Sequence, residues 1–171
     1  MTGVEIRAVP LSEKSDLWTM YQQYAHELAP LVNMEPIDGV IADPRFDHYW
    51  REPQHWPFWA TVNEQRVGFA LIKFVPEEQA MRVAEFYVAP EHRRAGIGLA
   101  FASRLLAQYP GPWRIREIAA NTPAVAFWRN VVAPYGYAET RFADRGIDRI
   151  EQTLIVTWPD APRPRAPTHK H

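Results

Sequence analysis

A basic turn with two glycines is the segment of this sequence best suited to bind a ligand. It spans residues 93–98, Arg-Arg-Ala-Gly-Ile-Gly, between an apolar strand-like run and a segment with helical spacing. The first N–H groups of a helix have no intrahelical acceptor, and the helix dipole gives them partial positive charge. Glycine permits close backbone approach, and the arginines add charge. The turn therefore predicts a site for a phosphate or pyrophosphate.

Two interpretations of the turn remain open when it is considered alone. It binds a phosphate, or its glycines only shape a tight turn while the arginines stay solvated. Two common nucleotide-binding loops are excluded by residue type. The turn contains no Gly-Lys-Ser/Thr sequence, and Phe101 stands where a Gly-x-Gly-x-x-Gly fingerprint needs its third glycine.

A carboxylate in the apolar strand before the turn is the leading catalytic candidate. Glu85 is costly to bury there unless it is paired or functional. Strand alternation places it on one face with Val83 and Tyr87. One interpretation is a base that binds or deprotonates an amine. The other is a structural ion pair with Arg82 or Arg116.

Two segments together resemble motifs of the GNAT acyltransferase superfamily. The turn matches the pattern Gln/Arg-x-x-Gly-x-Gly/Ala at every fixed position. Residues 121–128, Asn-Thr-Pro-Ala-Val-Ala-Phe-Trp, resemble Asn-x-x-Ala-x-x-Phe-Tyr/Trp, and Gly136-Tyr137 resembles the Gly-Phe that often follows. The resemblance is specific over residues 81–137. It implies an enzyme, an N-acetyltransferase with acetyl-CoA as cosubstrate, that acts on a primary amine by direct attack in a ternary complex.

The resemblance also implies a set of cofactor-binding residues. The strand end would bind the pantetheine arm and the acyl carbonyl, the turn amides would hold the pyrophosphate, and Asn121 would lie near the pantetheine. The implied residues are Phe86, Tyr87, Val88, Arg93, Arg94, Ala95, Gly96, Ile97, Gly98, Leu99, Asn121 and Trp128.

The proton donor for the leaving thiolate is the point at which the sequence departs from the family pattern. Many members use a tyrosine at the position that Trp128 occupies here, and an indole cannot supply a proton. Tyr137 is the predicted substitute, with Tyr135 and Tyr87 as weaker ones; otherwise water assists the thiolate. The same departure supports an alternative function, a non-catalytic acyl-CoA-binding sensor.

The segment 46–59 is rich in aromatic residues, and the resemblance places the wall of the acceptor site here. We expect Asp47 and Trp50 to bind the amine together with His26 and Glu85, with cation–π contacts contributing. Packing in the core is the alternative for each aromatic residue. The spacing of the histidines fits no standard metal site, so we expect no metal.

The order of elements predicts an α/β (α+β) fold. It runs strand, helix, three antiparallel strands, helix, strand, helix and two strands. The resemblance specifies a GNAT fold: a mixed, mostly antiparallel central sheet of six to seven strands flanked by about four helices. Strands 81–88 and 113–120 would be splayed apart. We expect one domain over residues 1–158 and a proline-rich, flexible tail over 159–171.

Composition excludes several function classes. The chain has 171 residues, a formal net charge of -1 and no cysteine, which removes disulfides, thiolate metal sites and a cysteine nucleophile. Near-neutral charge argues against nucleic acid and anionic membranes as partners. Without a signal-like or membrane-spanning run, we expect a cytoplasmic protein. The resemblance allows a monomer or a homodimer.

Overall fold

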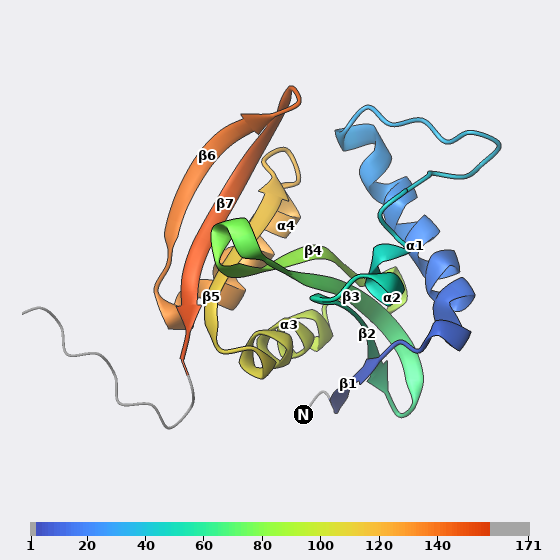
Figure 1. The fold of residues 1–171 in the computed structure, drawn as a ribbon, viewed down its shortest axis with the longest axis horizontal. Helices are drawn as coiled ribbons and strands as arrows, with labels where there is room; N and C mark the ends of the chain where they lie inside the picture. Colours follow the sequence, from blue (N-terminus) through green and yellow to red (C-terminus); the bar gives the residue numbers. More distant parts are fainter. Residues whose placement is uncertain (1–2, 158–171) are drawn as a thin grey trace, which may run out of the picture.

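The computed structural model describes residues 3–157 and places them in one seven-stranded sheet with helices on both faces (Figure 1). The strands are β1 (Val4–Ala8), β2 (His55–Val62), β3 (Gln65–Val75), β4 (Ala80–Val88), β5 (Gly111–Ile118), β6 (Ala138–Asp144) and β7 (Ile147–Val156). The helices are α1 (Lys14–Leu28), α2 (His48–Arg51), α3 (Ile97–Gln108) and α4 (Thr122–Val132).

The sheet consists of two antiparallel halves joined at one short parallel contact. Its order is β1-β2-β3-β4-β5-β7-β6. β4 and β5 pair only from Met81–Trp113 to Val83–Ile115, and beyond these pairs the two strands separate. The predicted GNAT architecture and its splayed pair of strands are therefore confirmed.

A bulge in β4 corrects the predicted alternation at the splay. Leu71 of β3 lies opposite Glu85, but the next residue of β3, Ile72, lies opposite Val83, so Ala84 is the extra residue. Val83 therefore packs into the core under α3 and α4, whereas Tyr87 packs on the α1 face. The expectation that Val83 shares a face with Glu85 is wrong, because the bulge reverses the alternation.

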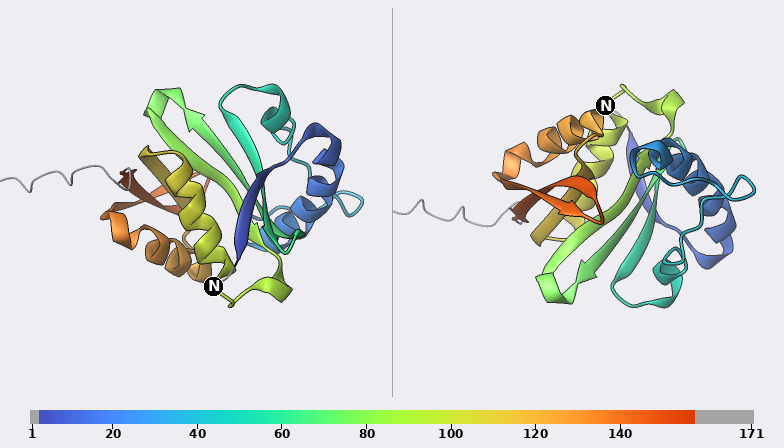
Figure 2. Two further views of the ribbon diagram at one scale, coloured as in Figure 1. Left: turned by 90° about the horizontal axis from the view of Figure 1, so that it is seen from below. Right: turned by 90° about the horizontal axis from the view of Figure 1, so that it is seen from above.

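Helices lie on both faces of the sheet (Figure 2), and each face has its own hydrophobic core. α3 and α4 cover one face through residues such as Phe101, Leu105 and Trp128. α1 and the segment around α2 cover the other face, where Phe46 and Trp59 are buried. Packing thus explains most of the aromatic residues in the segment 46–59, as the core interpretation predicted.

The structure does not describe the end of the chain, and it bears only in part on the expectation that no segment spans a membrane. The predicted tail, residues 159–171, falls outside the described residues, as does Trp158. Between residues 3 and 157, no helix combines the length and the apolar character needed to cross a membrane.

Gly68 is predicted to be required for the close approach of β3 to the end of β4. A Cβ on Gly68 would collide with the carbonyl oxygen of Tyr87 and lie 3.1 Å from the Cα of Val88. Both obstacles are main-chain atoms, so we expect Gly68→Ala to lower the free energy of unfolding by about 1–3 kcal/mol in urea denaturation.

Gly98→Ala is the matched control for this prediction. Its new Cβ would lie 3.2 Å from the edge of the Phe127 ring, which can shift, and alanine favours the helix by up to about 1 kcal/mol. We expect its stability to stay within about 1 kcal/mol of wild type. Equal losses in the two variants would contradict the argument from main-chain contact.

Candidate active site

The turn at residues 93–98 forms a cradle of free backbone donors at the start of α3. The Arg93 amide donates to the carbonyl oxygen of Pro90 at 3.2 Å, and the next amide with a backbone acceptor is that of Ala100, 3.1 Å from the carbonyl oxygen of Gly96. Among residues 3–157, the six amides from Arg94 to Leu99 have no protein acceptor. Arg94 and Gly96 have positive φ angles of 62° and 76°, which curve the chain around this point. The arrangement fits an anion with several oxygens.

The side chain of Arg93 anchors the turn to α1. Its two terminal nitrogens donate to both carboxylate oxygens of Glu27, at 2.9 and 2.8 Å, and its Nε donates to the carbonyl oxygen of Val88 at 2.8 Å. The guanidinium also lies over the ring of Tyr87. We expected this guanidinium to add charge beside the anion site, and the structure pairs it with Glu27.

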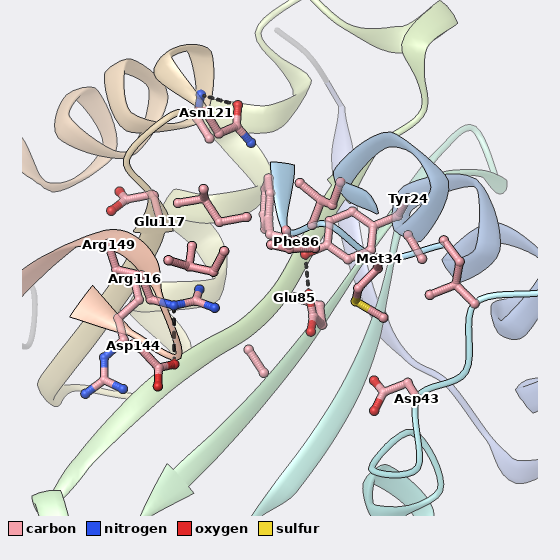
Figure 3. A pocket seen from close by; sticks show the side chains of 18 of the residues that line it. Tyr24, Met34, Asp43, Glu85, Phe86, Arg116, Glu117, Asn121, Asp144 and Arg149 are labelled. Carbon is pink, nitrogen blue, oxygen red and sulfur yellow. Dashed lines mark hydrogen bonds and ion pairs between the residues drawn. The ribbon is translucent and has the colours of Figure 1, made fainter. Parts of the chain in front are cut away.

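A cavity of about 1010 Å³ fills the splay between β4 and β5. α1 and the loop of residues 32–45 form one wall, and the β6–β7 turn with the start of α4 forms the other (Figure 3). Of the predicted site residues, four line this cavity: Glu85, Phe86, Asn121 and Trp128.

The carboxylate of Glu85 is held at the cavity wall by a residue that the sequence analysis missed. It accepts a hydrogen bond from the Tyr24 hydroxyl, which reaches down from α1 (Figure 3). Burial raises the pKa of Glu85 to about 7, although this hydrogen bond acts in the opposite direction. Arg82 and Arg116, the alternative ion-pair partners, instead bind Glu78. Glu85 is thus positioned to gain and lose a proton near neutral pH.

The side of the cavity formed by α4 contains residues of the second motif. Asn121 caps α4 by accepting a hydrogen bond from the Ala124 amide at 3.4 Å. Phe86 packs against Trp128, with ring centroids 5.1 Å apart. Trp128 is buried and presents an apolar surface to the cavity. It has no group that titrates near neutral pH.

The other predicted acceptor residues and the predicted proton donor lie away from the cavity. Asp47 forms an ion pair with Lys14, and Trp50 donates from its indole nitrogen to the carbonyl oxygen of Val9 at 3.0 Å. His26 is exposed and bonds to Gln22 of its own helix. Tyr137 is 37% exposed and does not line the cavity, so its position does not fit protonation of a thiolate there.

The Acetyltransferase (GNAT) family model matches residues 17–131 of the sequence. This chain belongs to the GNAT acetyltransferase family. The match includes β4, the turn, α3 and most of α4, which are the elements that form the cradle and the splay. No curated protein sequence gives a significant match to the chain.

Solved structures of GNAT proteins share the fold at low sequence identity. An acetyltransferase from Thermus thermophilus superposes with a TM-score of 0.69 at 17% identity, over 91% of this chain and 100% of that one. Ribosomal-protein-alanine N-acetyltransferase from Brucella melitensis gives 0.62 at 20% identity, over 89% and 99%. Spermidine N-acetyltransferase from Vibrio cholerae, solved with CoA and spermine, gives 0.67 at 12%, over 91% and 97%.

A buried carboxylate on β5 is a second feature of this GNAT site that the sequence did not reveal. Glu117 is only 4% exposed and lines the cavity. Neither of its oxygens has a hydrogen-bond partner in the part of the chain that the structure describes. Burial raises its pKa to about 8. Its place in an apolar strand was visible in the sequence, but its direction under α4 was not.

Glu117→Gln is predicted to make the protein more stable than wild type, by a margin that grows as the pH rises. Because the pKa of Glu117 is raised in the folded state, the folded chain binds more protons than the unfolded one between about pH 4.5 and 8. The contribution of Glu117 to the free energy of unfolding is therefore fully present below pH 4.5, where the carboxyl is neutral in both states. It falls as the pH rises toward 8. We expect the variant to exceed wild type by about 1–3 kcal/mol at about pH 8, with little difference at about pH 5.

Urea denaturation across this pH range checks the prediction. Glu77→Gln, at an exposed position, is the matched control and should follow wild type at every pH. Parallel curves for wild type and Glu117→Gln would show that the Glu117 carboxyl does not titrate on unfolding.

Proposed function

We propose that this GNAT protein is an acetyl-CoA-dependent N-acetyltransferase that transfers the acetyl group to a primary amine of a small molecule or peptide. The amine attacks directly within a ternary complex. The observation that carries the proposal is the location of Glu85. It stands two residues beyond the last β4–β5 pair, on the wall of the cavity that the splay opens.

The cradle at the start of α3 supports acetyl-CoA as the cosubstrate. Six free amides suit the oxygens of a pyrophosphate, and β4 leads from this cradle into the splay. Past Val83, the edge of β4 that faces β5 has no strand partner, so its backbone groups are available to the amides of a pantetheine arm. The CoA-bound spermidine acetyltransferase from Vibrio cholerae shares this fold. When bound, acetyl-CoA supplies the activated acyl group.

Glu85 performs the proton transfer on the amine side. Formation of the N–C bond requires the amine to lose a proton, and a carboxylate with a pKa of about 7 accepts one near neutral pH. Tyr24 holds the carboxylate in place through its hydroxyl. The C–S bond that breaks releases a thiolate, which takes its proton from water because Trp128 offers none.

Binding and turnover assays separate this proposal from a non-catalytic acyl-CoA sensor. Both functions predict that acetyl-CoA raises the melting temperature and that ATP and NAD do not. Only the enzyme releases free CoA when a panel of primary amines is added. Binding without CoA release from any amine would favour the sensor, and no response to acetyl-CoA would exclude both.

Glu85→Gln is predicted to lower kcat/KM by about 10²- to 10⁴-fold, because it removes the general base. The Kd for acetyl-CoA should stay unchanged, since the cradle lies elsewhere. Calorimetry and steady-state kinetics measure the two quantities, with Glu77→Gln as the exposed control. Unchanged turnover would contradict the assignment of Glu85.

Tyr24→Phe is predicted to move the pH profile upward. In wild type, kcat/KM should rise with pH through about 7 as Glu85 ionises. The Tyr24 hydroxyl stabilises the ionised carboxylate, so its loss raises the pKa of Glu85 and shifts this limb to higher pH. If kcat/KM of Tyr24→Phe rose over the same pH range as that of wild type, the hydrogen bond would have no effect on the pKa of Glu85.

A further inference from the structure

A smaller chamber opens from the cavity on the side where Glu85 lies. Its volume is about 230 Å³, and Glu85 lines both spaces, so the chamber begins where the amine would react. The polar lining of the chamber is dominated by cationic side chains. They are Arg45, Lys73, Arg82, Arg116 and Arg149.

The three acidic residues of the chamber already have partners. Asp43 accepts hydrogen bonds from the Tyr21 hydroxyl at 2.8 Å and from the backbone amide of Arg45 at 3.0 Å. Asp144 lies 3.4 Å from Arg149 (Figure 3). Glu85 accepts from Tyr24. Four of the five cations also have a carboxylate partner: Arg45 has Asp43, Arg82 and Arg116 share Glu78, and Arg149 has Asp144.

Of the cations that line the chamber, Lys73 has the least negative charge close to it. Within residues 3–157, no carboxylate oxygen lies within 4 Å of its ammonium group. Burial, and then the charges of Arg82 and Arg45, lower the pKa of Lys73. The Nε atom of Arg149 lies 3.4 Å from the Asp144 carboxylate, but that of Arg82 is buried and has no hydrogen-bond acceptor in the described residues. Such a donor is costly unless an anion binds to it.

The strand register places Lys73 close to the reacting end of the acceptor site. Leu71 lies opposite Glu85, and Lys73 is two residues further along β3, opposite Arg82. Two residues of a strand span roughly 7 Å, and both side chains line the same chamber. One small molecule can therefore reach both Glu85 and Lys73.

From this arrangement, and resting on the proposed function, we propose that the acceptor is a small amine that also carries an anionic carboxylate, phosphonate or phosphate group. The amine lies at Glu85, and the anionic group binds Lys73 beside Arg82. A polyamine would place its second cation among these side chains and be repelled.

The first test compares acceptors on the wild-type protein. β-Alanine and 3-aminopropylphosphonate carry the proposed anionic group, propylamine lacks it, and putrescine replaces it with a cation. We expect kcat/KM for the better of the two anionic amines to exceed that for propylamine by about 10- to 100-fold, with putrescine the poorest. The order of the two anionic amines distinguishes a carboxylate site from a phosphonate site.

The second test removes the charge of Lys73. In Lys73→Met, the ratio of kcat/KM for the anionic amine to kcat/KM for propylamine should fall by about 10- to 100-fold, because only the anionic amine loses a charged partner. Lys14→Met is the matched control, since Lys14 pairs with Asp47 and does not line the chamber. Its preference for the anionic amine should match that of wild type.

The outcomes separate failure of this inference from failure of the proposed function. Acetylation of propylamine or putrescine as efficient as that of both anionic amines would leave the function standing and overturn the anionic site. If no amine is acetylated, the function fails, and calorimetry of β-alanine and 3-aminopropylphosphonate with the CoA-bound protein decides the inference. Binding that Lys73→Met weakens supports it, and binding of neither, or binding that Lys73→Met leaves unchanged, overturns it.

Discussion

The short parallel contact between β4 and β5 is the constraint on which the rest of the site depends. Three residue pairs join the two halves of the sheet, and the last is Val83–Ile115. Beyond it, two right-handed antiparallel halves twist apart, and the bulge at Ala84 turns β4 further. The result is a cavity lined by strand backbone that has lost its sheet partner. A buried edge of this kind needs hydrogen-bond partners, and an extended ligand can supply them.

The same bulge determines which side chains of β4 face the acceptor side of the cavity. Without it, Val83 would share a face with Glu85; with it, the residues before and after Ala84 serve opposite sides of the sheet. The carboxylate therefore projects toward α1, where Tyr24 meets it. Its burial and its proton affinity both follow from this position.

Charge divides the cavity into regions with different roles. The start of α3 offers uncharged amides, and Arg93, one of the two arginines of the turn, is paired with Glu27. On the other side, the acceptor chamber contains Lys73 of β3, whose ammonium group is partly buried and has no carboxylate partner in the described residues. We infer that the cradle selects its ligand by backbone geometry and that the acceptor chamber selects by charge.

Local patterns in the sequence were enough to predict the elements, the turn with its helix start and the place of Glu85 in a strand, because each depends on neighbours a few residues away. Tertiary structure alone decided which distant side chains meet: Tyr24 and Glu85 are 61 residues apart, and Arg93 and Glu27 are 66 apart. His26, which we expected at the acceptor site, does not line the cavity for the same reason. α1 presents Tyr21, Tyr24, Ala25 and Leu28 to the cavity, and this helical stripe excludes His26. Which stripe faces the site depends on packing against the sheet, and the chain's local order does not contain that information.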